Sequence, residues 1–226
     1  MTRGILIAGN ESSLFSAVAA EAVKRVESFA SVFVPNRLPL PEGRGISSSA
    51  VQAVEGAIPL PWNPASPISA RTLVLAAENR LGQINDAILV CLPPAVFKSV
   101  ETLIPEEIEI LVNDQIKGWF FLLRELIMYF RKQKAGSLSL VTVDINRAGG
   151  KNAPVDLLGP SVEASFRAFA QSVLASQANE PFRTMGFAAA AGKEEAFAAW
   201  LFKLIDEGAA KHSGRWHKHS KLKLFR

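Results

Sequence analysis

Residues 62–90 read WNPASPISARTLVLAAENRLGQINDAILV, and this stretch decides the fold. We predict a helix over residues 67–81, closed by Gly82, because glycine commonly follows the last turn of a helix. The apolar run AILVCL at 87–92 then has the composition of a buried strand, and two prolines follow it. A helix that leads into an apolar strand favours a parallel sheet with helices on both faces.

The same alternation extends toward both ends of the chain. On the amino-terminal side we predict strands at 4–8, 30–34 and 57–60, a helix at 12–29 and a loop at 35–49. On the carboxyl-terminal side we predict helices at 106–133, 161–176 and 193–210, and strands at 137–143, 183–189 and 218–225. The predicted fold class is a doubly wound, Rossmann-like α/β domain with a mostly parallel seven-stranded sheet, and we expect residues 1–226 to form a single domain.

Composition narrows the class of protein further. Hydrophobic residues make up 49% of the 226 residues and charged residues 20%, which is typical of a soluble globular chain. A single cysteine, Cys91, excludes an intramolecular disulfide, and the first residues lack the pattern of a signal peptide, so we expect a cytoplasmic protein. The longest apolar run, 119–123, is far shorter than the roughly 20 residues that cross a membrane.

The net charge of +4 depends on the end of the chain, because residues 211–226 contain Lys and Arg but no acid. Contact with nucleic acid through this segment is one interpretation. No groove of basic and aromatic residues elsewhere supports it, so we expect a solvated basic edge and no nucleic-acid partner.

Four segments together resemble the short-chain dehydrogenase/reductase family in the order and spacing of their elements. They are residues 62–90, 111–143, 161–177 and 192–225, and the second contains a glycine inside a long helix, Gly118. The resemblance covers nearly the whole chain. It implies the family's fold, a dinucleotide cofactor and a four-helix interface between subunits.

The glycine-rich turn of the family, TGxxxGxG, reads AGNESSLF here, at residues 8–15. Gly9 keeps the first glycine, but Ser13 and Phe15 stand where the family lacks side chains. Those glycines let a pyrophosphate approach the start of the helix. We therefore expect Phe15 to fill part of that space.

Polar residues at this turn could still bind an anion with a different loop geometry, although a plain capped helix is the alternative. The cofactor-binding residues that we predict are Gly9, Asn10, Ser12, Ser13 and Arg37. In the family a basic residue at the position of Arg37 pairs with the 2′-phosphate of NADP, so NADP is the implied cofactor if a dinucleotide binds. The acid that contacts adenine in the family is replaced by Pro61 or Trp62.

The catalytic residues of the family are missing. The positions that resemble its tyrosine, lysine, serine and asparagine hold Gly159, Glu163, Val143 and Gln115. The only tyrosine, Tyr129, has no lysine four residues later, and we interpret it as a packing residue. The segment where the family places a substrate-covering lid is reduced to a few residues. We predict no catalytic residue of the usual hydride-transfer mechanism.

Other groups of polar residues are weak candidates for a site. His212, His217 and His219 lack nearby cysteine or acid to complete a metal site, so no metal is predicted. Asp144, Asp156 and Glu163 lie near the expected active site, where two carboxylates could serve acid/base chemistry, but we interpret them as solvated loop acids.

The long helix has apolar residues on more of its circumference than one core face requires. Together with the following helix it gives a predicted subunit interface of Trp119, Phe120, Leu123, Ile127, Phe166 and Phe169. We expect a homodimer or a tetramer, and a different protein partner is also open. The leading hypothesis is a non-catalytic, oligomeric binding or scaffold protein. The alternatives are an NADP-dependent oxidoreductase with an altered site and a sensor of a nucleotide or small molecule.

Overall fold

The computed structural model describes residues 3–34, 56–93, 95–144, 156 and 158–219. The predicted loop at 35–49 lies outside them. The strands are β1 (Ile5–Gly9), β2 (Phe29–Phe33), β3 (Ala57–Pro59), β4 (Asp86–Cys91), β5 (Ser137–Asp144), β6 (Arg183–Ala190) and β7 (Arg215–Lys218). The helices are α1 (Ser13–Val23), α2 (Pro67–Leu81), α3 (Pro105–Leu111), α4 (Gly118–Gln133), α5 (Leu158–Ala175) and α6 (Glu194–Glu207).

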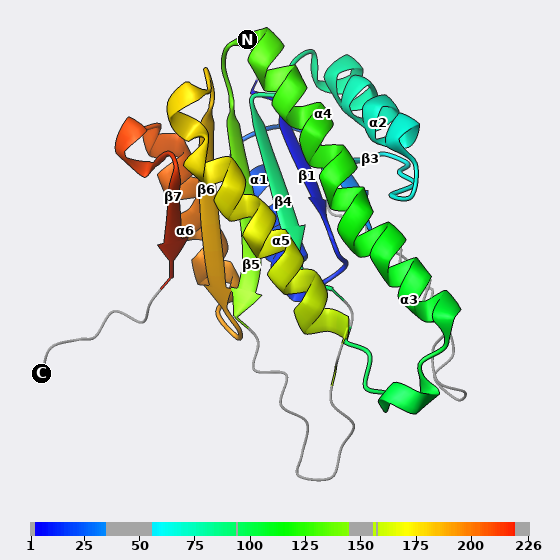
Figure 1. Ribbon diagram of the computed structural model, residues 1–226. Helices are drawn as coiled ribbons and strands as arrows, with labels where there is room; N and C mark the ends of the chain where they lie inside the picture. Colours follow the sequence, from blue (N-terminus) through cyan, green and yellow to red (C-terminus); the bar gives the residue numbers. More distant parts are fainter. Residues whose placement is uncertain (1–2, 35–55, 94, 145–155, 157, 220–226) are drawn as a thin grey trace, which may run out of the picture.

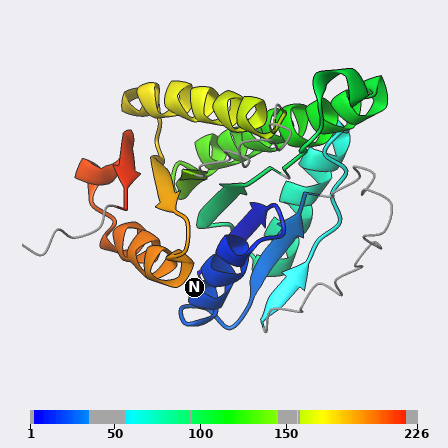
Figure 2. The same ribbon diagram turned by 90° about the horizontal axis from the view of Figure 1, so that it is seen from below.

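The seven strands form one sheet in the order β3-β2-β1-β4-β5-β6-β7, and every pairing is parallel (Figure 1). Helices α2, α4 and α5 cover one face, and α1 and α6 cover the other (Figure 2). This confirms the predicted doubly wound, Rossmann-like fold. The order reverses between β1 and β4, which places a topological switch point at their carboxyl ends.

Both faces of the sheet are buried, which explains why the strands are apolar without alternation. In β1, Leu6 and Ala8 belong to the core beneath α2, α4 and α5, whereas Ile5 and Ile7 belong to the core beneath α1 and α6. All four side chains have no exposed surface. Burial of that kind contributes roughly 25 cal/mol for each Å² of apolar surface removed from water.

Three predicted elements differ from the structure. The helix expected at 12–29 ends at Val23, and Phe29 is the first residue of β2. The helix expected at 106–133 is divided by a π-helical turn, Val112–Lys117, which separates α3 from α4. The last strand was expected at 218–225, but β7 spans Arg215–Lys218 and residues 220–226 lie outside the described part. In β7 the segment pairs with β6, with Met185 opposite Arg215.

A network of charges holds the amino ends of the central strands to α6. The guanidinium of Arg3 lies 2.6 Å from the Asp86 carboxylate and 2.6 Å from that of Asp206, and Arg25 lies 2.8 Å from Asp206. Asp86 is buried and also accepts a hydrogen bond from the Ser137 hydroxyl. A buried carboxylate needs such partners, because a charge removed from water without them is strongly unfavourable.

We expect Asp206→Asn to lower the free energy of unfolding by about 1 kcal/mol at neutral pH, a value typical of partly exposed ion pairs. Partial burial acts to raise the pKa of Asp206, but hydrogen bonds from Arg25 and Arg3 outweigh it and hold the pKa below its ordinary value. A depressed pKa means that the ionised group stabilises the fold above the ordinary aspartate pKa of about 3.9 and loses this effect as pH falls through the folded-state pKa.

Urea denaturation of both proteins at pH 7 and near pH 3 measures this difference. The gap between wild type and Asp206→Asn should shrink in acid, whereas Glu27→Gln, at an exposed position outside the helices, should leave stability nearly unchanged at pH 7. An equal gap at both values of pH would contradict the electrostatic origin.

Candidate functional site

The candidate site lies at the carboxyl ends of β1 and β4, where the order of the strands reverses. Ligands of doubly wound sheets bind in the crevice outside these strand ends. Gly9 is the last residue of β1, and Asn10, Ser12 and Ser13 follow it into the start of α1. Arg37, the remaining predicted cofactor residue, lies outside the described residues.

Asn10 links three segments through its side chain. The amide nitrogen donates to the Gln115 side-chain oxygen at 2.9 Å, and the amide oxygen accepts from the backbone N–H of Leu92 at 2.9 Å. Asn10 is buried, with 6% of its surface exposed. Both ends of the amide are thus bonded to other parts of the protein, and Asn10 ties the ends of β1 and β4 to the π-helical turn.

Ser12 caps α1. Its hydroxyl accepts from the backbone N–H of Phe15 at 3.1 Å and donates to the carbonyl oxygen of Asn10 at 3.2 Å. One unsatisfied N–H of the first helical turn is thereby paired within the chain. Ser13 differs, because it is exposed and lines a cavity between α1 and α6.

Phe15 is a core residue that packs against the turn. Its ring centroid lies 4.4 Å from that of Phe33, and 1% of its surface is exposed. A Cβ atom added at Gly9 would come within 2.7 Å of the Phe15 ring and 3.0 Å of Val90. Gly9 therefore lacks a side chain for a reason of internal packing, since Phe15 occupies the adjacent space.

Trp62, which the resemblance places near an adenine site, is buried within the core that α4 covers. Its ring centroid is 5.8 Å from that of Trp119, which in turn meets Phe166 edge-on at 5.4 Å. Trp62 is 9% exposed, and its ring contacts another side chain of the protein, that of Trp119.

At the position that resembles the catalytic tyrosine, Gly159 takes part in a structural contact. Its backbone N–H donates to the Asp156 carboxylate at 3.0 Å, and Asp156 also accepts from the backbone N–H of Val96 at 3.2 Å. Asp156 is 1% exposed, so the interpretation as a solvated loop acid was wrong. It fastens the segment after β4 to the beginning of α5, because buried carboxylates require such hydrogen bonds.

Glu163, at the position that resembles the catalytic lysine, lies one helical turn from Arg167. The carboxylate and guanidinium are 3.4 Å apart. Arg167 also lies over the ring of Trp216, 5.5 Å from its centroid. Val143, at the position of the serine, is apolar and 6% exposed. The positions of the lysine and the serine thus hold a carboxylate paired with Arg167 and a packed apolar side chain.

Gln115 lies in the π-helical turn and is 3% exposed. The extra residue of a π-turn changes which side chains face inward, and such turns are frequent at functional sites. The turn was missed in the sequence, although the three consecutive polar residues at 113–115, between the apolar pairs 110–111 and 119–120, were the available signal. Its neighbour Asn113 accepts from the ammonium of Lys117 at 2.8 Å.

Tyr129 lies at the opposite edge of the sheet, close to the amino end of β4. Its hydroxyl oxygen accepts from the backbone N–H of Ile84 at 3.0 Å, and its ring meets that of Phe130 at 5.6 Å. Burial and the nearby Glu78 raise its pKa, while the Ile84 hydrogen bond acts in the opposite direction. It is a packing residue, as predicted, and it does not reach the carboxyl edge.

The predicted interface residues divide into two groups. Trp119, Leu123 and Phe166 are at most 3% exposed within one subunit, so a partner could cover almost none of their surface. The prediction was wrong for these three, because they pack onto the sheet. Phe120 is 42% exposed and stacks on Phe169 at a centroid distance of 3.9 Å, and Ile127 is half-buried.

The histidines contact one another and their neighbours. His212 lies 3.1 Å from Glu207, and His217 contacts the carbonyl oxygen of His212 at 3.0 Å. Among the described residues, no group of three or more His, Cys, Asp or Glu side chains is arranged to hold a metal ion. Within the same residues, no helix combines the length and hydropathy that crossing a membrane requires.

Comparison with known proteins gives matches to structures alone. No family model matches the chain, and no curated protein matches it significantly. A short chain dehydrogenase from Mycobacterium smegmatis has a TM-score of 0.71 at 14% identity, covering 98% of this chain and 93% of its own. A 3-ketoacyl-(acyl-carrier-protein) reductase from Brucella melitensis, complexed with NADH, has a TM-score of 0.72 at 14% identity, covering 96% of each chain.

A citronellol catabolism dehydrogenase from Pseudomonas aeruginosa has a TM-score of 0.67 at 16% identity, covering 96% of this chain and 92% of its own. Similarity at these identities concerns the arrangement of the backbone and does not extend to the residues of a site. The chain therefore has the fold of the short-chain dehydrogenases and reductases.

Proposed function

We propose that the protein is a non-catalytic, self-associating binding protein built on this fold. One observation carries the proposal: two buried polar side chains at the carboxyl edge of the sheet, Asn10 and Asp156, are bonded to the protein itself. Asn10 spans β1, β4 and the π-helical turn, and Asp156 fastens the start of α5. In an enzyme of this fold, groups at that edge would face substrate and cofactor.

Acid/base chemistry at this edge lacks its usual groups. A general acid or base must lie within hydrogen-bond reach of the atom that gains or loses a proton. Gly159 has no side chain to supply, and Glu163 is paired with Arg167. The Tyr129 hydroxyl is hydrogen-bonded near the amino end of β4, at the opposite edge of the sheet. These features support a protein that does not transfer hydride by the mechanism of the family.

The turn after β1 does not fit a dinucleotide in the manner of the family. The space beside Gly9 is filled by Phe15, and the polar groups of Asn10 and Ser12 are engaged within the chain. A pyrophosphate at the start of α1 would need free N–H groups and a turn without bulky side chains. The competing function, an NADP-dependent oxidoreductase or a nucleotide sensor, depends on Arg37 and a rearranged turn.

Titration of the protein with NADPH and with NADH, followed by calorimetry and thermal shift, tests this misfit. We expect no saturable binding and no rise in melting temperature, because a ligand that binds the folded state raises its stability. A micromolar Kd for NADPH would overturn the proposal. Weaker binding of NADPH, but not of NADH, to Arg37→Ala would then assign the 2′-phosphate contact to that residue.

Self-association rests on the outward face of α4 and α5. Apolar side chains are exposed to solvent there. Phe120 is stacked on Phe169, and Met128 is 49% exposed. Further exposed apolar side chains are Ile108 in α3 and Val112 at the start of the π-helical turn, which are 40% and 37% exposed. Exposed apolar side chains on successive helices support a subunit interface even though the charged Arg124 lies between Phe120 and Met128, and a second copy of the chain is the partner that we propose.

We expect Phe120→Glu to dissociate the oligomer, because a carboxylate buried in an apolar interface has no partner. Light scattering coupled to size exclusion should give at least twice the 24.4 kDa of one chain for wild type and one chain mass for the variant. Ile68→Glu, at a 76% exposed position on α2, is the matched control and should keep the wild-type mass. A monomeric wild type at micromolar concentration would contradict the proposal.

A further inference from the structure

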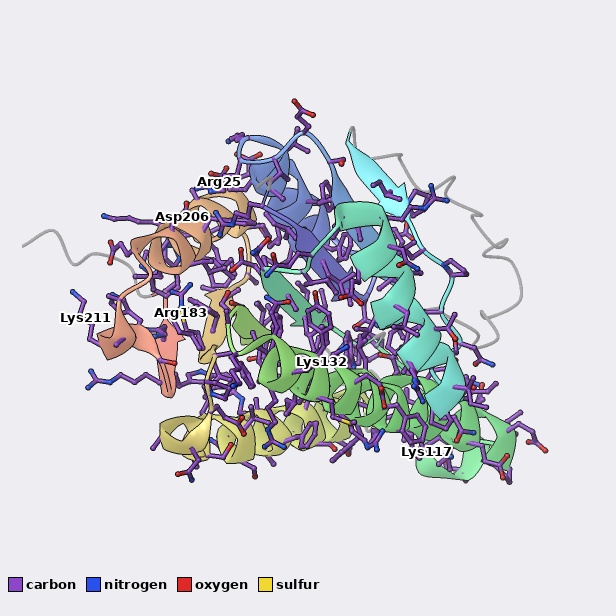
Figure 3. All side chains as sticks on the ribbon, turned by 90° about the horizontal axis from the view of Figure 1, so that it is seen from above. Arg25, Lys117, Lys132, Arg183, Asp206 and Lys211 are labelled. Atoms are coloured by element: carbon purple, nitrogen blue, oxygen red, sulfur yellow. The ribbon has the colours of Figure 1, made fainter. Side chains whose placement is uncertain are left out.

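A cavity of about 580 Å³ opens at the amino ends of the strands, on the edge of the sheet opposite the candidate site. It is bordered by the beginnings of β4, β5 and β6 and by the end of α6. Figure 3 looks onto this edge and shows Arg183 and Asp206 near the end of α6. Its position differs from the strand ends at which doubly wound sheets normally bind ligands.

The acidic groups at this cavity are already paired. Asp86 contacts Arg3 and the Ser137 hydroxyl, and Asp206 is shared by Arg3 and Arg25. Arg25 reaches Asp206 from outside the cavity wall and also pairs with Glu21. The wall itself carries two arginines and two aspartates, and Arg183 is the one of these four with no ion-pair partner among the described residues.

Arg183 is the first residue of β6 and reaches the end of α6. Its guanidinium donates to the carbonyl oxygen of Ile205 at 3.2 Å. Among the described residues, no carboxylate lies within 4.0 Å of it. Stabilising the helix end requires one N–H of the five that arginine carries, so most of its donors are unused by the protein.

A second donor faces the same space. The Asn85 side-chain oxygen accepts from the backbone N–H of Gly4 at 2.7 Å, and this contact fixes which way the amide is turned. Asn85 lines the cavity, and its amide nitrogen has no hydrogen bond to any described residue. Gln83 adds another side-chain amide to the wall.

We infer that this cavity binds a small molecule through an oxyanion, a carboxylate or a phosphate monoester, held by Arg183 and Asn85. A planar guanidinium forms two parallel hydrogen bonds with either group, and an amide N–H can add a third. Capping of α6 uses one donor of Arg183, and the Gly4 contact uses only the acceptor of Asn85, so the other donors of both residues remain at the cavity wall. The carbonyl end of α6 nearby opposes an anion, so we expect a Kd on the order of 1 mM.

Heteronuclear NMR of the full chain, labelled with ¹⁵N, tests the inference at constant ionic strength. The probes are inorganic phosphate, glycerol 3-phosphate and benzoate, with sodium chloride as the reference. We expect saturable shifts of the Asn85 side-chain amide and of the backbone amides of Gly136 and Gly208, which line the cavity. A larger response to glycerol 3-phosphate than to benzoate identifies a phosphate ligand, and the reverse order identifies a carboxylate.

Two variants decide whether the named groups hold the probe. Arg183→Gln should weaken binding at least about tenfold, since a charge-assisted bidentate contact is lost. Asn85→Asp keeps the acceptor for the Gly4 N–H and replaces the amide donor with a negative charge, so it should abolish binding in a protein that stays folded. Arg215→Gln removes the same charge from exposed β7 and serves as the control.

The inference fails if the folded wild type shows no saturable shift up to tens of millimolar probe. It also fails if Arg215→Gln weakens binding as much as Arg183→Gln, because that result indicates attraction by net charge alone. Should Arg183→Gln unfold through loss of the Ile205 contact, Asn85→Asp still decides the outcome.

Discussion

The buried amide of Asn10 organises the carboxyl edge of the sheet. A polar side chain inside a protein must form its hydrogen bonds there. A buried polar group without a partner destabilises the fold, because it has lost its hydrogen bonds to water and gained none in return. Asn10 meets this requirement through Gln115 and Leu92, which lie on separate segments. The end of β1, the segment after β4 and the π-helical turn are therefore fixed relative to one another. In a binding crevice, the same edge would have to remain open to a ligand.

Gly9 illustrates how one residue can satisfy two different patterns. In the family motif it belongs to a phosphate-binding turn, and in this structure its missing side chain gives room to Phe15. The ring of Phe15 joins α1 to the core through Phe33. A large apolar side chain beside Gly9 thus contributes to internal packing. The fold does not depend on a glycine at position 15, because its stability comes from apolar burial.

Most of the fold could be predicted from the sequence, because the apolar run at 87–92 and the helix at 67–81 are local patterns. The observed helix α2 spans the predicted residues. The sequence was insufficient where contacts between distant residues decide the outcome. Asn10 and Gln115 are 105 positions apart, and no local pattern reports their pairing. The interface prediction failed for Trp119 and Leu123 because a helix with two apolar faces does not reveal which one packs on the sheet. Asp156 was misjudged for the same reason, since its partners follow β4 and begin α5.

The bridge from Arg3 to Asp206 joins positions 203 residues apart in the chain. Arg3 precedes β1, a central strand, whereas Asp206 lies in the last turns of α6. During synthesis, the amino ends of the central strands would therefore lack part of their charge compensation until α6 has emerged from the ribosome. Contacts of such long sequence separation close large loops and slow folding. Full charge compensation at the amino ends of the central strands therefore requires α6, which follows β1 to β6 in the chain.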